Sequence, residues 1–433
     1  MKRLTCLLAC LTLAFLSGCS DSGPPPSPAE RGAVIIGIDA LDWQVLDPVI
    51  HAGKAPTFAR LRGESASGVN LSFVPLEKSP LIWASMATGL LPKDHGVGGF
   101  LRKDSEETKI LSSADWRAPA LWDIAGATGL ESCVIGWWVT FPARPIQGVM
   151  VSDYVSFTSA GPRNPEGMVR PQDLTGSLSA LTVDYRDVPL DLLRRFVPEA
   201  PEAQLTDPDD EYLVDLRLAL GGDLTYLAIA KKLLAEKPYD LTAIYFRGFD
   251  LTCHHYWQFM DAGDGRPASD EQQLLYGRII PRCLEVVDGW LTELLAILPA
   301  DINLIIASDH GFYGPRKDRH GSIRKGVHEH RPEGVLMVRS PLYTPGTRFD
   351  RSFVMNLGPI VLAHLGLPAS LEMPGRVLRE GLTADGLVFV EYLENNRIGT
   401  YASLAPAPPP EVKDDPALDE AVKKQLKSLG YVD

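Results

Sequence analysis

Three short apolar runs, each followed closely by an acidic residue, constrain the fold of this chain more than any other feature. They cover residues 34–38, 241–246 and 303–308. A continuous run of this length without alternation is typical of a strand that is buried on both faces, as in a parallel sheet covered by helices. A helical pattern over residues 121–127 precedes a further strand signal at 132–136, and one over 211–237 precedes the second apolar run at 241–246. The sequence therefore predicts an α/β protein with helices around a central, mostly parallel sheet.

Polar residues stand where these runs end, and the carboxyl ends of parallel strands form the usual ligand crevice of such sheets. Asp39 directly follows the first run, and Asp309 and His310 follow the third. Asp250 and His254 come shortly after the second run, four residues apart, so they share one face if a helix begins there. Each of these residues alone would more often be a cap or a core group, and their repetition at one predicted edge favours a site.

A serine helix start adds a hydroxyl to this set. Ser79 precedes Pro80, and the apolar stretch that follows ends at Gly89, which predicts an N-cap at Ser79, a first helical residue at Pro80 and a C-cap at Gly89. The positive end of a helix favours an anion, either a bound phosphate or a serine alkoxide. A plain helix cap is the alternative interpretation of the same pattern.

Counting the histidine at 330, which precedes a predicted strand at 334–338, seven candidates are expected at one edge of the sheet. They are Asp39, Ser79, Asp250, His254, Asp309, His310 and His330. Seven ligands suit two divalent ions, and a mixed carboxylate and imidazole set suits zinc best, with manganese or iron as alternatives. Two such ions can clamp the attacking and leaving oxygens of a phosphoryl transfer.

The N-terminus has the pattern of a bacterial lipoprotein signal. Two basic residues lead into an apolar segment too short to span a bilayer, and residues 16–19 read Leu-Ser-Gly-Cys. We expect a signal peptide over 1–18, lipidation of Cys19 and a proline-rich tether over 19–32. Ser20 favours the outer membrane. The expected location is the cell envelope, with a lipid anchor in the membrane and the protein facing the periplasm; an ordinary secretory signal is the alternative.

The net charge argues against a nucleic-acid partner, and the cysteine content indicates buried thiols. The chain has 42 basic and 55 acidic residues and a net charge of −13, so nucleic acid is not an expected partner. Of six cysteines, Cys133, Cys253 and Cys283 remain in the predicted mature chain, and buried thiols are expected for them.

Four further segments complete the predicted organisation. A catalytic domain is expected over 33–403, with an irregular insertion over 156–210, and a proline-rich arm with an amphipathic helix is expected over 404–433. The helix over 211–237 is expected to break at its paired glycines, Gly221 and Gly222. Trp137 and Trp138 are interpreted as core residues.

Taken in order, these motifs resemble the alkaline phosphatase superfamily, and within it the type I phosphodiesterase and nucleotide pyrophosphatase family. The resemblance covers roughly residues 34–378 and lies in motifs at 37–39, 79–89, 92–96, 137–149, 250–254, 308–311, 330–334 and 366–376. It implies an alkaline-phosphatase-like sandwich of helices around the sheet.

The resemblance also implies roles for the candidates. One metal would be held by Asp250, His254 and His330. A second metal would be held by Asp39, Asp309 and His310, with the nucleophile Ser79 coordinated to it and forming a phosphoseryl intermediate. His328 is a competing candidate for the role of His330.

Two departures limit the choice of substrate. Nucleotide pyrophosphatases of the family place an asparagine shortly after the motif that corresponds to His95 and Gly96, but here Gly98 and Gly99 stand instead, which disfavours nucleotides. Arg102, Lys103 and Arg247 are candidates for the missing positive charge, although each is more often a solvated residue. The stretch after Ser79 also lacks the pattern that a sulfatase needs for formylglycine.

The expected activity is therefore hydrolysis of phosphate esters, with phosphodiesters as the leading class. A phosphomutase or phosphoryl transferase on the same site is one alternative, since it would share the nucleophile and metals. A lipoprotein that binds a ligand in the envelope without catalysis is the other.

Overall fold

The computed structural model describes the chain from Gly32 to Ser428 with short gaps. The described residues are 32–104, 107–157, 166–263, 266–314, 316–317, 323–324, 331–404, 406–412 and 416–428. The predictions for the signal peptide, for Cys19, and for His328 and His330 lie outside the described residues. Among the residues that are described, no helix combines the length and the hydrophobicity needed to cross a bilayer.

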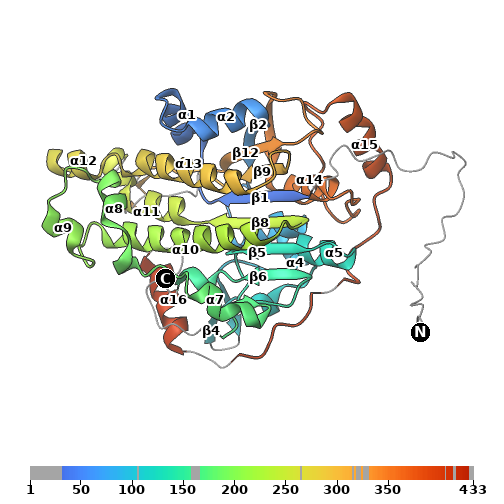
Figure 1. The fold of residues 1–433 in the computed structure, drawn as a ribbon, viewed down its shortest axis with the longest axis horizontal. Helices are drawn as coiled ribbons and strands as arrows, with labels where there is room; N and C mark the ends of the chain where they lie inside the picture. The colour runs from blue at the N-terminus through green and yellow to red at the C-terminus, as the bar shows by residue number, and fades with distance from the viewer. Residues whose placement is uncertain are drawn as a thin grey trace, which may run out of the picture.

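A nine-stranded sheet forms the centre of the molecule (Figure 1). Its order is β13 (Arg348–Phe353), β2 (Ala66–Leu71), β12 (Glu333–Arg339), β9 (Asn303–Ala307), β1 (Ala33–Ile38), β8 (Leu241–Phe246), β5 (Ser132–Ile135), β6 (Gly148–Val151) and β7 (Val169–Arg170). The central strands from β9 to β6 are parallel, whereas β12 and β7 run antiparallel to their neighbours. The predicted α/β class with a mostly parallel sheet is confirmed.

The strands predicted from apolar runs lie at the centre of the sheet, as their composition requires. Every residue of β1, β8 and β9 is buried. In the register, Gly37 lies beside Tyr245 of β8 and beside Ala307 of β9. The three strands therefore end at nearly the same level, which brings the residues that follow them to one edge.

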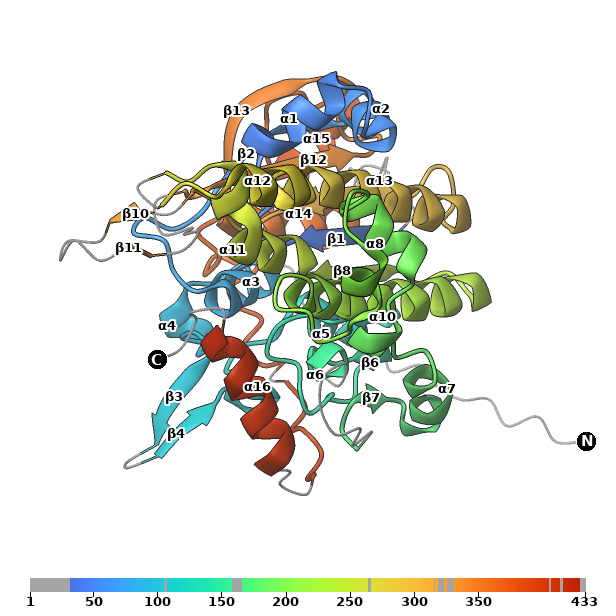
Figure 2. The same cartoon turned by 90° about the vertical axis from the view of Figure 1, so that its left-hand side faces the viewer.

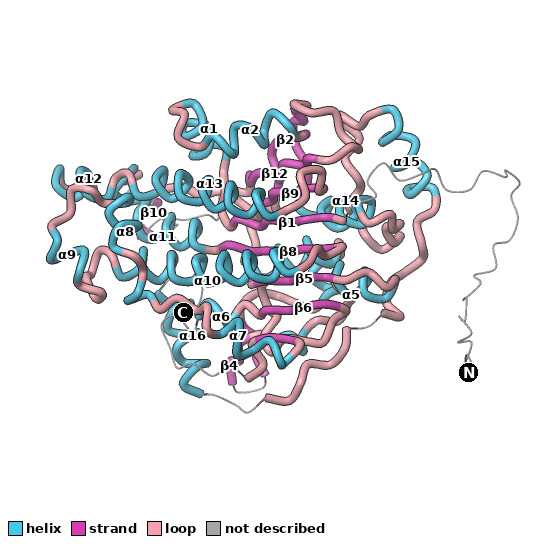
Figure 3. The backbone as a smooth tube through the Cα atoms, in the orientation of Figure 1, coloured by secondary structure: helices cyan, strands magenta, loops and turns pink. Residues whose placement is uncertain are grey.

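Helices cover the sheet on both faces (Figures 2 and 3). One group packs together around α10 (Val214–Glu236), α11 (Gly248–Met260) and α13 (Ile279–Ile297). The other group includes α3 (Ser79–Thr88), α4 (Pro92–His95), α5 (Leu121–Ala127) and α14 (Leu357–His364). The remaining helices are α1 (Trp43–His51), α2 (Pro56–Glu64), α6 (Tyr154–Phe157), α7 (Thr175–Ser179), α8 (Leu190–Phe196), α9 (Glu202–Thr206), α12 (Asp270–Tyr276), α15 (Ala384–Asn395) and α16 (Pro416–Ser428).

The two-stranded ribbons lie outside the central sheet. They are formed by β3 (Leu101–Asp104) with β4 (Glu107–Ile110) and by β10 (Arg316–Lys317) with β11 (Ile323–Arg324). The segment expected as an insertion contains short helices and the edge strand β7. The amphipathic pattern near the C-terminus forms α16, whose Val422 and Leu426 are buried as expected for a helix docked on the body.

One helix prediction was wrong, because α10 runs through Gly221 and Gly222 without a break. A Cβ on Gly221 would lie 3.2 Å from the carbonyl oxygen of Val183, and one on Gly222 would lie 3.3 Å from Ser156. The glycines therefore allow neighbouring segments to approach the helix closely, and this packing outweighs their low helix propensity. The structure confirms the other core predictions: Trp137 and Trp138 are buried, and so are the three free cysteines.

Candidate active site

The helix α3 presents Ser79 at the carboxyl edge of the sheet, but not as the predicted cap. The N-cap is Lys78, whose carbonyl oxygen accepts the first helical hydrogen bonds from Leu81 and Ile82. Ser79 is the first helical residue, one position after the cap. Its Oγ instead lies 3.3 Å from His310 Nε2. The predicted C-cap is confirmed, since Gly89 adopts a left-handed φ of 67°.

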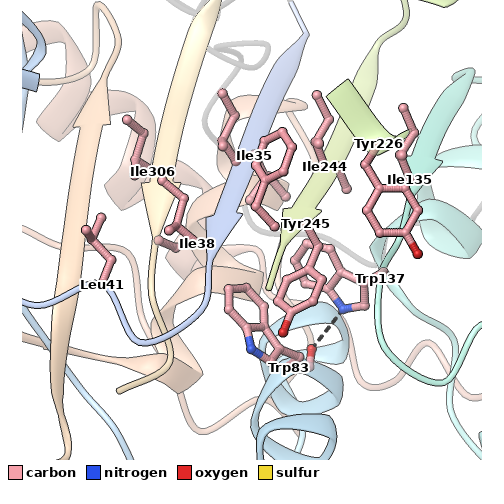
Figure 4. Close-up of a cluster of buried hydrophobic side chains, with 14 of the residues drawn as sticks. Ile35, Ile38, Leu41, Trp83, Ile135, Trp137, Tyr226, Ile244, Tyr245 and Ile306 are labelled. Atoms are coloured by element: carbon pink, nitrogen blue, oxygen red, sulfur yellow. Dashed lines mark hydrogen bonds between the residues drawn. The ribbon is translucent and has the colours of Figure 1, made fainter. Parts of the chain in front are cut away.

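Tight packing of α3 on β1 fixes this position. The indole of Trp83, one turn after Ser79, lies against Gly37, where an added Cβ would come within 2.7 Å of the ring. Trp83 also meets Tyr245 and Trp137 edge to face, with ring centroids 4.8 and 5.1 Å away (Figure 4). The glycine that precedes Asp39 by two residues thus lets the serine helix approach the strand.

Asp39, Asp309 and His310 converge beside Ser79. His310 Nε2 lies 3.4 Å from Asp39 Oδ1 and 3.4 Å from Asp309 Oδ2. One ligand atom from each of the three residues lies within 4.8 Å of the others, and all three side chains are buried. Ala40, with a left-handed φ of 59°, turns the chain after Asp39 and directs its amide toward Asp309 Oδ1 at 3.5 Å.

The hydrogen bonds of His310 determine which ring nitrogen faces the cluster. Nδ1 lies 2.9 Å from the carbonyl oxygen of Gly311, and because a carbonyl can only accept, Nδ1 carries the proton. A neutral ring then has its lone pair on Nε2, which points at Ser79 and the two carboxylates. This is the arrangement that a metal-ligating histidine requires.

The electrostatics of this cluster fit a cation. Burial raises the pKa of Asp39 well above its usual value, with the charge of Asp309 adding to the effect, and burial raises the pKa of Asp309 to about 7. Among the described residues, Asp39 Oδ1 and Asp309 Oδ2 have no hydrogen-bond partner. Buried carboxylate oxygens without donors are costly unless a positive charge faces them. The residues present therefore fit a divalent metal ion.

The second predicted ligand set is described in part. Asp250 and His254 lie in the first turns of α11, with His254 Nε2 3.5 Å from Asp250 Oδ2. The His254 ring meets Phe312 edge to face at 4.9 Å. Burial raises the pKa of Asp250, and the charges of Asp39 and Asp309 add to this shift. The carboxylates of the two predicted ligand sets are therefore close enough to interact electrostatically. His330, the third predicted ligand, is outside the described residues.

Tyr245 is a residue of this site that the sequence did not indicate. Its hydroxyl donates a hydrogen bond to Asp39 Oδ2 and accepts one of 2.6 Å from Trp138 Nε1. Burial raises the pKa of the phenol well above its usual value, so Tyr245 remains a donor. The position of Tyr245 one residue before the end of β8 could have identified it as a site residue. That inference required knowing that β8 lies beside β1, which carries Asp39 at its end.

The candidates for an additional positive charge, Arg102, Lys103 and Arg247, differ in how exposed their side chains are. Arg102 is exposed and forms an ion pair with Asp115, and the side chain of Lys103 is outside the described residues. Arg247 is 4% exposed, so the expectation of a solvated side chain was wrong for it. It is buried because α10 packs against α11 and the Phe157 ring of α6 lies over the guanidinium.

Fold and site together define the class of the protein. A mostly parallel sheet, a serine at a helix start and a buried aspartate and histidine cluster at the carboxyl edge are the features expected of an alkaline-phosphatase-like hydrolase. A family comparison matches residues 33–331 to type I phosphodiesterase / nucleotide pyrophosphatase, which is more than half of the 433 residues. The chain belongs to this family and is a phosphoric ester hydrolase.

Solved structures with a similar fold include three at low sequence identity. Phosphonoacetate hydrolase from Sinorhizobium meliloti is 18% identical, with a TM-score of 0.42, over 68% of this chain and only 59% of that chain. Human ectonucleotide pyrophosphatase / phosphodiesterase 5 is 13% identical, with a TM-score of 0.49, over 80% of this chain and 97% of that chain. The murine protein, in an inactive form with AMP, is 12% identical, with a TM-score of 0.46, over 83% of this chain and 100% of that chain. A comparison with curated protein sequences gave no match.

Proposed function

We propose that the protein is a metal-dependent phosphodiesterase that uses Ser79 as its nucleophile. The observation that carries the proposal is the placement of Ser79 Oγ, 3.3 Å from His310 Nε2, beside the buried cluster of Asp39, Asp309 and His310. A serine that capped its helix would direct its hydroxyl to a backbone amide, whereas Ser79 stands at the first helical position and its hydroxyl faces His310.

Two divalent ions would be held by this chain's carboxylates and imidazoles. Asp39, Asp309 and His310 would hold one, with Ser79 beside it, and Asp250, His254 and His330 would hold the other. The mixed oxygen and nitrogen donors suit zinc best, with manganese as the alternative. Bound ions would supply positive charge to the phosphoryl oxygens and lower the pKa of the serine hydroxyl.

The residues of the chain then divide the work of hydrolysis. Ser79 Oγ gives its proton to water and attacks phosphorus, a bond from Oγ to phosphorus forms, and the bond to the leaving oxygen breaks. The leaving group departs as an alcohol after taking a proton from water. The start of α3 favours the negative charge that develops at this position. Tyr245 holds Asp39 in place, and the proton on His310 Nδ1 keeps Nε2 directed at the reaction centre. Water then hydrolyses the phosphoseryl bond and restores Ser79.

Removal of the Ser79 hydroxyl tests the proposal. We expect Ser79→Ala to lower turnover of bis(4-nitrophenyl) phosphate by a factor on the order of 10³ or more, with the fold retained. Ser132 is a matched control, since it is also buried and its Oγ has no hydrogen-bond partner among the described residues. It is the first residue of β5 and therefore lies at the amino edge of the sheet, away from the carboxyl edge that carries Ser79. Ser132→Ala should keep wild-type turnover. Equal activity of Ser79→Ala and wild type would refute the nucleophile.

The same assay separates the alternatives. A phosphodiesterase releases 4-nitrophenol at a rate that an added acceptor alcohol leaves unchanged, whereas a transferase forms a new ester with that alcohol. An envelope lipoprotein that only binds a ligand would turn over neither diester nor monoester after loading with zinc or manganese.

We also propose that a lipid on Cys19 anchors the mature chain in the envelope, facing the periplasm. Support comes from the residues before Cys19, which are small and follow an apolar segment. Expression with a labelled fatty acid should label the wild type and not Cys19→Ala, and the variant should leave the membrane fraction. Equal labelling of both proteins would refute the anchor.

A further inference from the structure

Arg331 joins two segments of the site through an ion pair with Asp42. Asp42 is 1% exposed, follows Asp39 closely in the sequence and is the N-cap of α1. Arg331 Nε donates to Asp42 Oδ2 at 2.7 Å, and Arg331 Nη2 donates to Asp42 Oδ1 at 3.1 Å. A two-pronged, charge-assisted contact of this kind fixes the orientation of both side chains.

Arg331 has two further neighbours, and both contribute less than Asp42. Its Nη1 lies 3.6 Å from Glu333 Oε2, and the Glu333 side chain is 38% exposed, so water screens this contact. The Tyr313 ring lies 5.5 Å from the guanidinium carbon, which is a cation–π distance. The hydrogen bonds to Asp42 are the largest cause of the raised pKa of Arg331, ahead of Tyr313 and Glu333. Asp42 is therefore the partner that determines where the guanidinium lies.

The ion pair packs directly against Gly311, the residue after His310. A Cβ at position 311 would come within 2.5 Å of Asp42 Oδ2 and 2.7 Å of Arg331 Cγ. The Gly311 amide also donates to the backbone carbonyl of Arg331 at 2.9 Å. The backbone of Gly311 is therefore held against both members of the pair.

The position of Gly311 matters because its carbonyl orients His310. This carbonyl accepts the proton of His310 Nδ1 at 2.9 Å and so leaves Nε2 facing Ser79 and the two carboxylates. Hydrogen bonds of this kind set the direction of a metal-ligating imidazole. The contacts form a continuous path from Asp42 through Arg331 and Gly311 to the ring of His310.

An ion pair that only stabilises the fold is the alternative interpretation. Desolvation offsets much of the attraction within a buried pair, so its net contribution to stability is small. Asp42 Oδ1 also caps α1 by accepting from the Gln44 amide at 2.9 Å, but an asparagine would cap the helix equally well. The charge of Asp42 is therefore explained by Arg331 rather than by the helix.

We propose that Asp42 and Arg331 are positioning residues for His310. The pair fixes the Gly311 peptide, and the Gly311 carbonyl fixes the imidazole, so that Nε2 is already directed at the place where a metal ion binds. Neither member of the pair contacts the phosphoryl group in this role. The inference rests on the proposed function, because it assumes the metal ion proposed beside Ser79.

Zinc affinity and steady-state kinetics together test this role. A zinc titration against a chelating indicator should show one zinc ion bound about tenfold more weakly by Arg331→Met, the lower end of the range for outer partners of metal ligands. Arg331→Lys keeps the charge but loses the two-pronged contact, so its zinc affinity should be intermediate. At saturating zinc, the KM of Arg331→Met for bis(4-nitrophenyl) phosphate should equal that of the wild type.

Matched variants separate positioning from folding. Arg144 is also buried, pairs with Asp123 at 3.3 Å and donates to the carbonyl oxygen of Ala407, so Arg144→Met should keep the wild-type zinc affinity. Asp42→Asn combined with Arg331→Met keeps the cap of α1 and leaves no unpaired charge, so this double variant should fold and still bind zinc about tenfold more weakly. Thermal unfolding of each variant shows whether the fold is kept.

The possible failures are distinguishable. Wild-type zinc affinity in the folded double variant, or an equal loss of affinity in Arg144→Met, overturns the positioning role and leaves the proposed function intact. A raised KM of Arg331→Met with unchanged zinc affinity means that Arg331 contacts the substrate instead, and it also overturns the inference. A wild type that binds no zinc contradicts the proposed function and this inference with it.

Discussion

The contact between Tyr245 and Asp39 gives a prediction whose size follows from the structure. Tyr245→Phe removes the hydroxyl that donates to Asp39 Oδ2 and leaves Trp138 Nε1 without its acceptor. A hydrogen bond to a charged group is worth about 1.5–3 kcal/mol. Partners that orient a metal ligand typically change metal affinity by about 10–100-fold. We therefore expect zinc to bind Tyr245→Phe about 10–100-fold more weakly, or about 1.4–2.7 kcal/mol.

The assay is a zinc titration of the metal-free protein against a chelating indicator, with the dissociation constants of wild type and variant compared. Tyr343→Phe is the control, because Tyr343 is also a buried tyrosine and donates to the carbonyl oxygen of Leu378 at 3.1 Å. That variant should lose about 1 kcal/mol of stability and no metal affinity. Unchanged zinc affinity in a folded Tyr245→Phe protein would refute the orienting role of Tyr245.

Two further predictions concern how the site is supported. Gly37→Ala should lower the free energy of unfolding by about 1–3 kcal/mol, because the new Cβ would lie 2.7 Å from the Trp83 ring. Adding Trp83→Phe to this variant should recover part of the lost stability, as measured by urea unfolding. No recovery would mean that the strain arises elsewhere. Burial lowers the pKa of His95 from 6.5 to about 4, so between these pH values the unfolded chain binds a proton there and the folded chain does not. Relative to His95→Gln, the wild type should lose about 3 kcal/mol as the pH falls from 6.5 to 4, and parallel stability curves for the two proteins would contradict this.

The centre of the fold was predictable because its strands are buried on both faces. Residues of β1, β8 and β9 are apolar without interruption, and the acids that follow them mark the carboxyl edge directly in the sequence. Edge elements such as β7 carry no such pattern, since their pairing depends on neighbours distant in the chain. The break predicted at Gly221 and Gly222 failed for the same reason: the close packing that favours glycine there is tertiary.

The grouping of Asp39, Asp309 and His310 beside Ser79 was predictable from the sequence, but the contacts that support these residues were not. Asp39, Asp309 and His310 stand next to apolar runs, and Ser79 precedes a proline at a helix start, so local signals were enough to select them. The hydrogen bond from Tyr245 to Asp39 requires β8 to lie beside β1. The burial of Arg247 requires Phe157 of α6 to cover it. Both facts follow from the order of the elements in space, which a single sequence does not contain.

The central claim, that Ser79 forms a covalent intermediate with phosphorus, can be tested by trapping that intermediate. Zinc-loaded protein is mixed with bis(4-nitrophenyl) phosphate, quenched in acid during turnover and digested for mass spectrometry. The account predicts a phosphoryl adduct on the peptide that contains Ser79, together with a burst of 4-nitrophenol, and neither in Ser79→Ala. Turnover by Ser79→Ala at the wild-type rate, with no adduct on Ser79 in the wild type, would contradict it.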